Sequence, residues 1–482
     1  MKEIVSLFIG QAGVQLSSAV WELFAAEHEI PLSGIALNQS GIECDGIDRV
    51  FSINSRNQAV PRCLLIDMEP TVIDEVRTGS YKQFFGPLNL LSGFEDAASI
   101  FARGYFTQGR FYINQLLEKF HQQIELADSI QAISFMHSLG GGTGSGLYSL
   151  VLEEMDNYTK ITKIDMSVHP SFSSSQVIVE PYNSILAQHY TFDDTDISFI
   201  VDNEALFKLV SNQLMIEKPS YGSINKVVAQ AFSLITASSR YSDHSCTLSE
   251  VLHNLVPFPR IHYPTCSLSP VLSEDHLQHS TNTVHSITKS GLSNRCQLLS
   301  CDLMEGKFMT CCLMYRGNIN SGEIYEAIRR LKCYDNLKFV DWCPTGIKVT
   351  LCTKCPSYIA NSKIGPSDKL LSIVANNSAV TDPLLHNTFR FQLLFQKRAF
   401  VHWFVGEGME EDEFKDSLEN LACLIKDYEE CSLSTKCLAE INPVSQNNNE
   451  DANVSYKEIF SPTQVTQEPI KSLETELAET EY

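Results

Sequence analysis

A run of glycines and hydroxyl residues is the part of this sequence best suited to hold a phosphate group. Residues 140–146 are Gly-Gly-Gly-Thr-Gly-Ser-Gly, and they follow a predicted strand at 130–136. The apolar residues Tyr148, Val151 and Leu152 behind the run have helical spacing. Glycines let the backbone approach an anion closely, and the amides and dipole at a helix amino terminus attract its charge. The run therefore predicts a phosphate-binding loop, with a flexible loop that binds nothing as the alternative.

The glycine run lacks the features of the two common nucleotide motifs. No Lys-Ser or Lys-Thr pair follows it, and its spacing misses the Gly-x-Gly-x-x-Gly pattern of dinucleotide-binding folds. A triphosphate bound without the P-loop lysine needs other groups to neutralise its charge. Asp67, Glu69 and Asp96 offer hard oxygen ligands of the kind that Mg²⁺ prefers. Taken singly, each of these acids is more often a solvated surface carboxylate.

The first 205 residues alternate short apolar runs with segments of helical periodicity, which is the pattern of an α/β domain with a parallel sheet. Predicted strands lie at 4–9, 63–66, 130–136 and 197–201, and each ends in small or polar residues. Ligands of open parallel sheets bind at the carboxyl ends of the strands. We therefore expect the residues that follow these strands to converge on one site.

The remainder of the chain divides by pattern into three further parts. Strand-like segments among helices and polar loops predict a second, mixed α/β domain at 204–380, after the first domain at 1–203. A helical domain is expected at 381–442, where one helical stripe at 410–431 comprises Phe414, Leu418, Leu421, Ile425 and Tyr428. Residues 443–482 hold eight acidic residues and two lysines, which predicts an acidic disordered tail.

Charge and composition exclude several classes of partner. The 482 residues include 36 Lys and Arg against 58 Asp and Glu, so the net charge of −22 repels nucleic acids and anionic membranes. No apolar run approaches the ~20 residues that span a bilayer, and the amino terminus lacks a signal-peptide cleavage pattern. We expect a cytoplasmic protein with no nucleic-acid or membrane partner.

Motifs spread over the chain before about residue 435 resemble those of the tubulin family. They are Gly-Gln-Ala-Gly-Val-Gln at 10–15, Asp-x-Glu-Pro-Thr at 67–71, the glycine run at 140–146, Val-Glu-Pro-Tyr-Asn at 179–183, Asn-Leu-Val-Pro at 254–257, Val-Asp-Trp-Cys-Pro-Thr-Gly at 340–346, Lys-Arg-Ala-Phe-Val-His-Trp at 397–403 and Gly-Glu-Gly-Met-Glu at 406–410. The last three segments and Glu250 resemble the α-tubulin branch, because β-tubulins carry a lysine where this chain has Glu250.

The resemblance implies a tubulin-like domain that binds GTP with Mg²⁺, a heterodimer with β-tubulin, and assembly into cytoskeletal microtubules. It places Tyr221 against the guanine base, Asn203 and Asn225 on the edge of the base, and Gln176 near the sugar. The other positions matched to the GTP site are Gln11, Asp96, Ala97, Ser138, Gly141, Gly142, Thr143 and Gly144. Glu69, together with Asp67 or Asp96, would organise the Mg²⁺ ion.

Glu250 is the catalytic residue that the resemblance implies. In the family, the matching glutamate of the α-subunit reaches the exchangeable GTP of the neighbouring β-subunit and positions the attacking water. A carboxylate can orient and polarise such a water, whereas a lysine cannot accept its proton. The alternative is a helix-surface glutamate without a catalytic role.

Several positions depart from the family pattern. Ser99 and Ile100 stand where relatives carry paired asparagines, Gln176 replaces a threonine, and the loop at 242–249 is one residue shorter. A non-catalytic, specialised tubulin-fold protein that binds GTP and caps or modifies microtubules is therefore the alternative function. In either case the acidic tail would meet motors and microtubule-associated proteins first.

Overall fold

The computed structural model describes residues 3–31, 34, 46–54, 56–155, 158–171, 177–241, 247–279, 282–334, 337–343, 346–359 and 362–433. Three sequence-based predictions concern residues outside this set. They are the role of Gln176, most of the shortened loop at 242–249, and the tail at 443–482.

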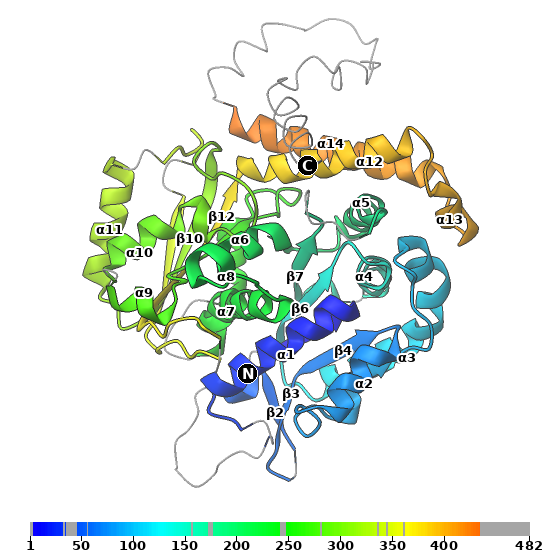
Figure 1. The fold of residues 1–482 in the computed structure, drawn as a ribbon, viewed down its shortest axis with the longest axis horizontal. Coiled ribbons are helices and arrows are strands. Elements are labelled where there is room, and N and C mark those ends of the chain that lie inside the picture. The colour runs from blue at the N-terminus through cyan, green and yellow to red at the C-terminus, as the bar shows by residue number, and fades with distance from the viewer. Residues whose placement is uncertain are drawn as a thin grey trace, which may run out of the picture. The chain divides into compact units, whose positions relative to one another are not determined.

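A six-stranded sheet forms the amino-terminal part of the fold, and every pair of neighbouring strands in it is parallel (Figure 1). In spatial order its strands are β5 (Leu90–Ser92), β4 (Cys63–Asp67), β1 (Glu3–Ile9), β6 (Ile130–Ser138), β7 (Thr162–His169) and β8 (Ile197–Asp202). The predicted parallel sheet is confirmed, and the strands predicted at 4–9, 63–66, 130–136 and 197–201 correspond to β1, β4, β6 and β8.

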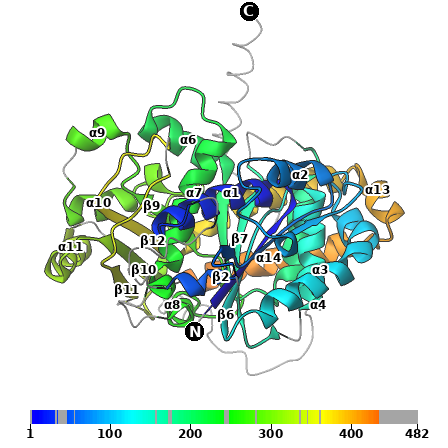
Figure 2. The same cartoon turned by 90° about the horizontal axis from the view of Figure 1, so that it is seen from below.

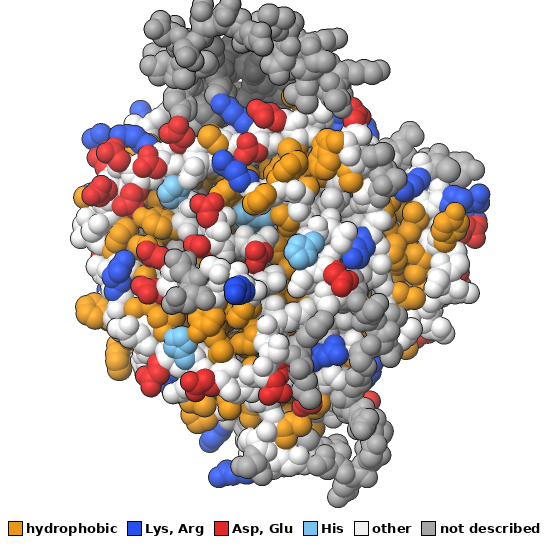
Figure 3. Space-filling view, turned by 180° about the vertical axis from the view of Figure 1, so that it is seen from behind, with side chains coloured by type: hydrophobic (Ala, Val, Ile, Leu, Met, Phe, Trp, Pro, Cys, Tyr) orange, Lys and Arg blue, Asp and Glu red, His pale blue; other side chains and the backbone are white. Residues whose placement is uncertain are grey.

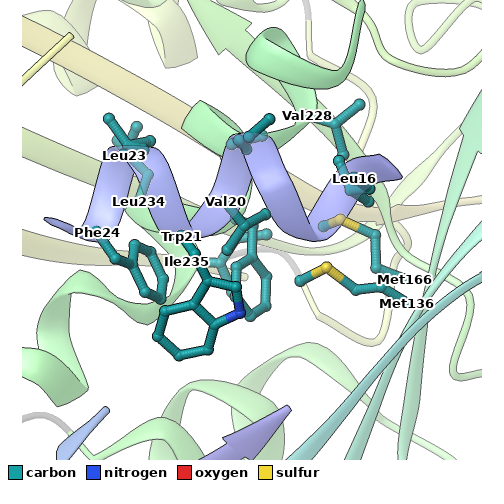
Figure 4. Close-up of a cluster of buried hydrophobic side chains, with 14 of the residues drawn as sticks. Leu16, Val20, Trp21, Leu23, Phe24, Met136, Met166, Val228, Leu234 and Ile235 are labelled. Atoms are coloured by element: carbon teal, nitrogen blue, oxygen red, sulfur yellow. The ribbon is translucent and has the colours of Figure 1, made fainter. Parts of the chain in front are cut away.

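Helices cover both faces of this sheet, as the apolar residues on alternate sides of each strand require. On one face, Phe8 and Met136 pack in a single cluster with residues of α1 (Gly10–Glu27), α2 (Pro70–Thr78), α6 (Asn203–Leu214) and α7 (Tyr221–Arg240). Figure 4 shows the part of this cluster where Trp21 and Phe24 of α1 meet Ile235 of α7. On the other face, Phe135 packs with residues of α3 (Gln108–Glu125), α4 (Tyr148–Glu154) and α5 (Glu180–Thr191).

Strand β7 is absent from the sequence-based prediction, and the reason lies in its polar residues. Its sequence alternates apolar and polar residues, a pattern typical of a strand with one solvated face. In the structure that polar face is buried, and its Asp165 is hydrogen-bonded to groups on both neighbouring strands. Ser198 Oγ donates to Asp165 Oδ2 at 2.6 Å, and His137 Nε2 lies 2.9 Å from Asp165 Oδ1. A solvated strand and a buried, mutually hydrogen-bonded strand thus share one sequence pattern.

A second sheet of four strands confirms the predicted mixed α/β part. Its strands, in spatial order, are β11 (Ile347–Cys352), β10 (Phe308–Gly317), β12 (Lys369–Asn377) and β9 (Thr265–Ser269). Only β10 and β11 are parallel, and the other pairs are antiparallel. Helices in this part of the chain are α8 (Leu248–Leu255), α9 (Glu274–His279), α10 (Val284–Gly291) and α11 (Ser321–Tyr334). A separate antiparallel pair is formed by β2 (Phe51–Ile53) and β3 (Ala59–Pro61).

Three helices follow the second sheet: α12 (Thr381–Phe395), α13 (Val401–Gly406) and α14 (Asp412–Ser432). The predicted apolar stripe lies on α14, where Phe414 and Tyr428 are fully buried and Leu418 is partly buried.

On the face shown in Figure 3, Lys and Arg side chains lie among Asp and Glu. Within the described part of the chain, no helix combines the length and the apolar character needed to cross a bilayer.

A buried ionic cluster links helices α1 and α7 to strand β10 of the second sheet. Glu27 at the end of α1 accepts bonds from Arg240 of α7 and Arg316 of β10, each at 2.5 Å. All three residues are buried, with exposed fractions of 3% or less. Ser233 Oγ donates to the same carboxylate at 2.6 Å. Burial alone would raise the pKa of Glu27, but the two guanidinium groups and Ser233 lower it to about 2. Breaking such a buried pair leaves an uncompensated charge, at a cost of about 3–5 kcal/mol.

His28 is held uncharged beside this cluster. Its ring stacks on Tyr241 at 5.4 Å, and burial, followed by the charge of Arg240, lowers its pKa from 6.5 to about 3. Between these two pH values the unfolded chain binds a proton at His28 and the folded chain does not. Stability must therefore fall as the pH falls below about 6.5.

We predict that His28→Gln weakens the acid sensitivity of the fold. Wild-type stability should fall by about 1 kcal/mol per pH unit from this group between pH 6 and 5, and the variant should lose that contribution. Thermal unfolding of the purified protein at pH 7, 6 and 5 measures it. His402→Gln, a change at an exposed position, should keep the wild-type dependence. An unchanged pH dependence in His28→Gln would contradict the prediction.

Candidate nucleotide-binding site

A pocket of about 290 Å³ lies at the carboxyl edge of the six-stranded sheet, beside the ends of β1, β6, β7 and β8. Five residues predicted to bind GTP line it together: Gln11, Ser138, Asn203, Tyr221 and Asn225. They come from α1, the end of β6, and the first turns of α6 and α7. The segments after β1, β6 and β8, which are far apart in the sequence, thus meet at one place.

The start of α1 forms one wall of the pocket. Gly10 has a φ of +75°, a left-handed conformation that turns the chain from β1 directly into the helix. Helix α1 then runs so close to β6 that a Cβ added at Gly13 would lie 2.5 Å from the carbonyl oxygen of Met136. No side chain caps the amino terminus of α1, so its first amides keep their capacity to bind an anion.

The glycine run packs its backbone against neighbouring backbone. It continues into a π-helical turn, η4 (Thr143–Leu147), and then into α4. A Cβ added at Gly142 would lie 2.6 Å from the amide nitrogen of Ile100, and one added at Gly144 would lie 2.3 Å from the carbonyl oxygen of Ser138. A Cβ at Gly141 would meet nothing within 4 Å. Packing therefore explains two of these glycines, whereas Gly141 faces open space.

Residues 97–101, here called the 97–101 loop, lie against the glycine run. Ala98 and Ser99 have φ values of +48° and +56°, which are uncommon for residues with a side chain. Asn183 of α5 contacts both segments. Its Nδ2 donates to the carbonyl oxygens of Ser99 at 2.7 Å and Gly140 at 2.8 Å, and its Oδ1 accepts the amide of Phe101 at 2.9 Å.

The opposite end of the pocket suits a flat aromatic group. Tyr221 begins α7 and is 46% exposed, with its ring at 5.6 Å from that of Phe207 in an edge arrangement. Asn203 begins α6, directly after Asp202, whose side chain accepts the amide of Glu204 at 3.0 Å. The pocket lining therefore combines an aromatic face and side-chain amides from the starts of α6 and α7 with the uncapped start of α1.

Asp67 is the acid whose surroundings fit a cation. It is 4% exposed, its Oδ1 accepts the amide of Glu69 at 3.3 Å, and its buried Oδ2 has no hydrogen-bond partner among the described residues. Burial raises the pKa of Asp67 to about 7, and the charges of Glu69 and Asp96 add to that rise. A divalent cation would satisfy the unpaired oxygen and neutralise these charges. Among the described residues no three His, Cys, Asp or Glu side chains form a metal site by themselves, so Mg²⁺ would need phosphate oxygens as well.

The structure leaves several predicted site residues away from the pocket lining. They are Asp67, Glu69, Asp96, Ala97, Gly141, Gly142, Thr143 and Gly144. The glycine run nevertheless borders α1, because a Cβ added at Gly10 would lie 3.2 Å from the amide nitrogen of Gly144. Glu250 is exposed in the first turn of α8 and is not part of this pocket.

The predicted GTP site lacks five polar residues that line the pocket: Gln15, His137, His169, Ser171 and Glu180, of which His137 directly follows the strand predicted at 130–136. Two of them follow from β7, which the sequence pattern did not identify. Glu180 stands in the quoted motif at 179–183 and opens α5, so its place at a helix start after a strand was a usable signal. Burial lowers the pKa of His169 to about 4, which keeps this side chain neutral at the pocket edge.

Comparison with protein families assigns both halves of the described fold. Residues 3–211 match the model described as the Tubulin/FtsZ family, GTPase domain. Residues 259–387 match the tubulin C-terminal domain. The first match contains the six-stranded sheet, and the second contains the four-stranded sheet and the start of α12.

Similar proteins extend over nearly the whole chain. The tubulin alpha-1 chain of Emericella nidulans is 41% identical over 434 residues, which cover 89% of this chain and 97% of the relative. The tubulin alpha-2 chain of Caenorhabditis elegans is 40% identical, with 89% and 96% covered. The tubulin alpha-3 chain of Saccharomyces cerevisiae is 40% identical, with 89% and 97% covered.

A matched pair of glycine substitutions tests the reading of the glycine run. Gly142→Ala should destabilise the fold by about 1–3 kcal/mol, because its Cβ would overlap the backbone of Ile100. Gly141→Ala should leave thermal stability unchanged and weaken nucleotide retention, since its Cβ would occupy the open space expected to hold phosphate. Thermal unfolding and the nucleotide content of the purified variants measure the two effects. Full nucleotide retention in Gly141→Ala would show that the ligand does not use this space.

Proposed function

Because this chain belongs to the Tubulin/FtsZ family, we propose that it is an α-tubulin-like subunit that binds GTP with Mg²⁺, pairs with β-tubulin and polymerises into microtubules. The single observation that carries GTP binding is the pocket that unites Gln11, Ser138, Asn203, Tyr221 and Asn225. The uncapped start of α1 supplies amides for phosphate, and Tyr221 supplies a face for a base. The asparagine amides can donate to and accept from the edge of guanine.

Mg²⁺ is the cation that we assign to this site. Asp67 and Glu69 would hold it from the side of β4, and the bound ion would offset the negative charge of the phosphates. The unpaired Oδ2 of Asp67 supports this assignment, because a buried carboxylate oxygen otherwise lacks any compensation.

Polymerisation needs two different surfaces that fit each other on successive subunits. Two separate groups of exposed apolar residues are suited to that role. Phe258 and Trp342 form an edge-on pair at 5.8 Å and are 47% and 45% exposed. Trp403 and Val405 on α13 are 57% and 45% exposed. Helix α8, which precedes Phe258, and helix α13 lie well apart in two perpendicular views (Figures 1 and 2).

The exposed position of Glu250 supports a role at a neighbouring subunit's nucleotide and not at this chain's own. It is exposed, it lies outside the pocket, and it stands on the α8 segment just before the apolar pair of Phe258 and Trp342. We propose that it orients the water that attacks the GTP of the next β-subunit. A structural alternative is specific: Thr247 Oγ1 caps α8 by accepting the Glu250 amide at 3.3 Å, so Glu250 occupies the position of a capping-box glutamate.

One observation favours a non-catalytic, specialised tubulin-fold protein as the second candidate. The 97–101 loop presents Ser99 and the apolar Ile100 beside the glycine run, where the family resemblance implies two asparagines. Such a protein would bind GTP and cap or modify microtubules. Copurification with β-tubulin and entry of a tagged copy along the microtubule wall separate the two candidates, since a cap would mark filament ends only. The acidic residues at 443–482 would attract motors and associated proteins in either case.

We predict that the purified complex carries guanine nucleotide in this chain. Denaturing the complex and separating the released nucleotides by chromatography should yield GTP in excess of what the β-subunit alone accounts for. Tyr221→Ala should reduce that amount, because the change removes the aromatic face of the pocket. A folded dimer with no guanine nucleotide beyond the β-subunit's share would refute the proposed function.

Loss of the Glu250 carboxylate should slow GTP hydrolysis by the partner. Glu250→Gln keeps the size of the side chain, so assembly should persist while phosphate release from the polymer falls ~100-fold, a typical effect of losing a general base. Glu274→Gln, a change at another exposed first-turn glutamate, serves as the control. Equal phosphate release from wild-type and Glu250→Gln polymers would leave the capping position as the role of Glu250.

A further inference from the structure

Asn183 makes hydrogen bonds to backbone atoms only, and these atoms belong to two segments that would flank the same phosphate. It is fully buried. Two of its bonds hold Ser99 and Phe101 of the 97–101 loop, and the third holds Gly140 at the start of the glycine run. The side chain therefore fixes one segment relative to the other, whatever side chains those segments carry.

We infer that Asn183 is a positioning residue, which sets the 97–101 loop against the glycine run before the nucleotide binds. This inference rests on the proposed nucleotide binding. Asn183 itself would not contact the nucleotide. The residue acts by holding backbone amides and carbonyls at the place where the terminal phosphate and its Mg²⁺ would bind. Preorganised amides bind the nucleotide without a further ordering cost. Loss of the Asn183 hydrogen bonds should therefore appear first as faster release of the nucleotide.

The conformation of the 97–101 loop shows why a hold is needed. Ala98 and Ser99 are consecutive residues in the left-handed region, which is unfavourable for residues that carry a Cβ. Within the loop, the backbone is supported by the bond from the Ile100 amide to the Ala97 carbonyl at 3.0 Å. The bonds of Asn183 to Ser99 and Phe101 add to that support from outside the loop. The strained backbone is thus kept in place by a residue more than 80 positions away.

The support behind Asn183 is rigid. On the same helix, Tyr182 is fully buried and its hydroxyl donates to the carbonyl of Ala399 at 3.0 Å. Asn387 of α12 donates to Ser184 Oγ at 2.7 Å. Residues directly before and after Asn183 are therefore anchored to the turn between α12 and α13 and to α12. A positioning group needs such a fixed base, because a mobile one would transmit no geometry.

Burial alone would make any asparagine in this position important for stability, so the test needs a matched control. Asn89 provides one: it is 1% exposed, its Nδ2 donates to the carbonyls of Pro61 at 2.8 Å and Cys63 at 2.7 Å, and its Oδ1 accepts the amide of Gly86 at 2.9 Å. Both asparagines make two donor bonds to backbone carbonyls and accept one backbone amide, and Asn89 adds a contact with Cys63 Sγ at 3.9 Å. Asn89 does not line the pocket.

The experiment compares Asn183→Ser with Asn89→Ser in the full-length chain, purified as the complex with β-tubulin. Two quantities are measured for each: the thermal midpoint, and the release rate of this chain's guanine nucleotide after Mg²⁺ is chelated with EDTA. Both variants should lower the thermal midpoint by similar amounts. Asn183→Ser alone should speed release by about tenfold or more, since a misplacement of about 1 Å can cost ~100-fold in a positioned site.

Equal release rates in the two variants would overturn the inference. If the wild-type complex holds no nucleotide in this chain, the proposed function fails instead, and the two failures are distinguishable.

Hydrogen exchange of the wild-type complex adds a measurement that needs no variant. The Phe101 amide should be protected both with nucleotide and after its removal, because Asn183 holds it in either state. Exchange of that amide at the solvent rate after removal would also overturn the inference.

Discussion

Close approach of one backbone segment to another is the constraint on which the candidate site depends. Helix α1 can lie against β6 only because Gly13 has no side chain, and the glycine run can lie against the 97–101 loop only because Gly142 has none. These contacts bring helix starts and strand ends to the same edge of the sheet. Any Cβ at either position would push the segments apart, and the amides would no longer face a common point.

The base end of the pocket depends on a different kind of contact. Tyr221 and Asn225 stand in the first turns of α7, whose far end carries Arg240. The bond of Arg240 to Glu27 ties that end of α7 to α1, and Arg316 ties the same carboxylate to the second sheet. The long helix is thus fixed at its carboxyl end by buried charge and along its length by apolar packing. Helix α1 therefore both lines the candidate site with its start and fixes the position of α7, which carries Tyr221 and Asn225.

Sequence patterns identified much of this fold, for physical reasons that the structure makes explicit. Strands β1, β4, β6 and β8 are mostly apolar runs, and such runs predict buried parallel strands well. Strand β7 escaped because its buried face is polar, and whether a polar face is solvated or internally bonded is a property of its neighbours. Asn183 escaped as well, since its role consists of bonds to segments distant in sequence. The sequence pattern predicted polar residues after the strands, but the spacing of residues along the chain could not show which of them line the pocket.

The bonds of Asn183 have a consequence for how this chain can change over evolution. All three of its partners are backbone atoms, and every residue type offers the same carbonyl and every residue except proline the same amide. Substitutions at positions 98–100 can therefore accumulate while the path of the loop is retained. A loop whose path is specified by a distant residue can change its side chains, as Ser99 and Ile100 do relative to the paired asparagines that the family resemblance implies, without losing the bonds that hold its backbone.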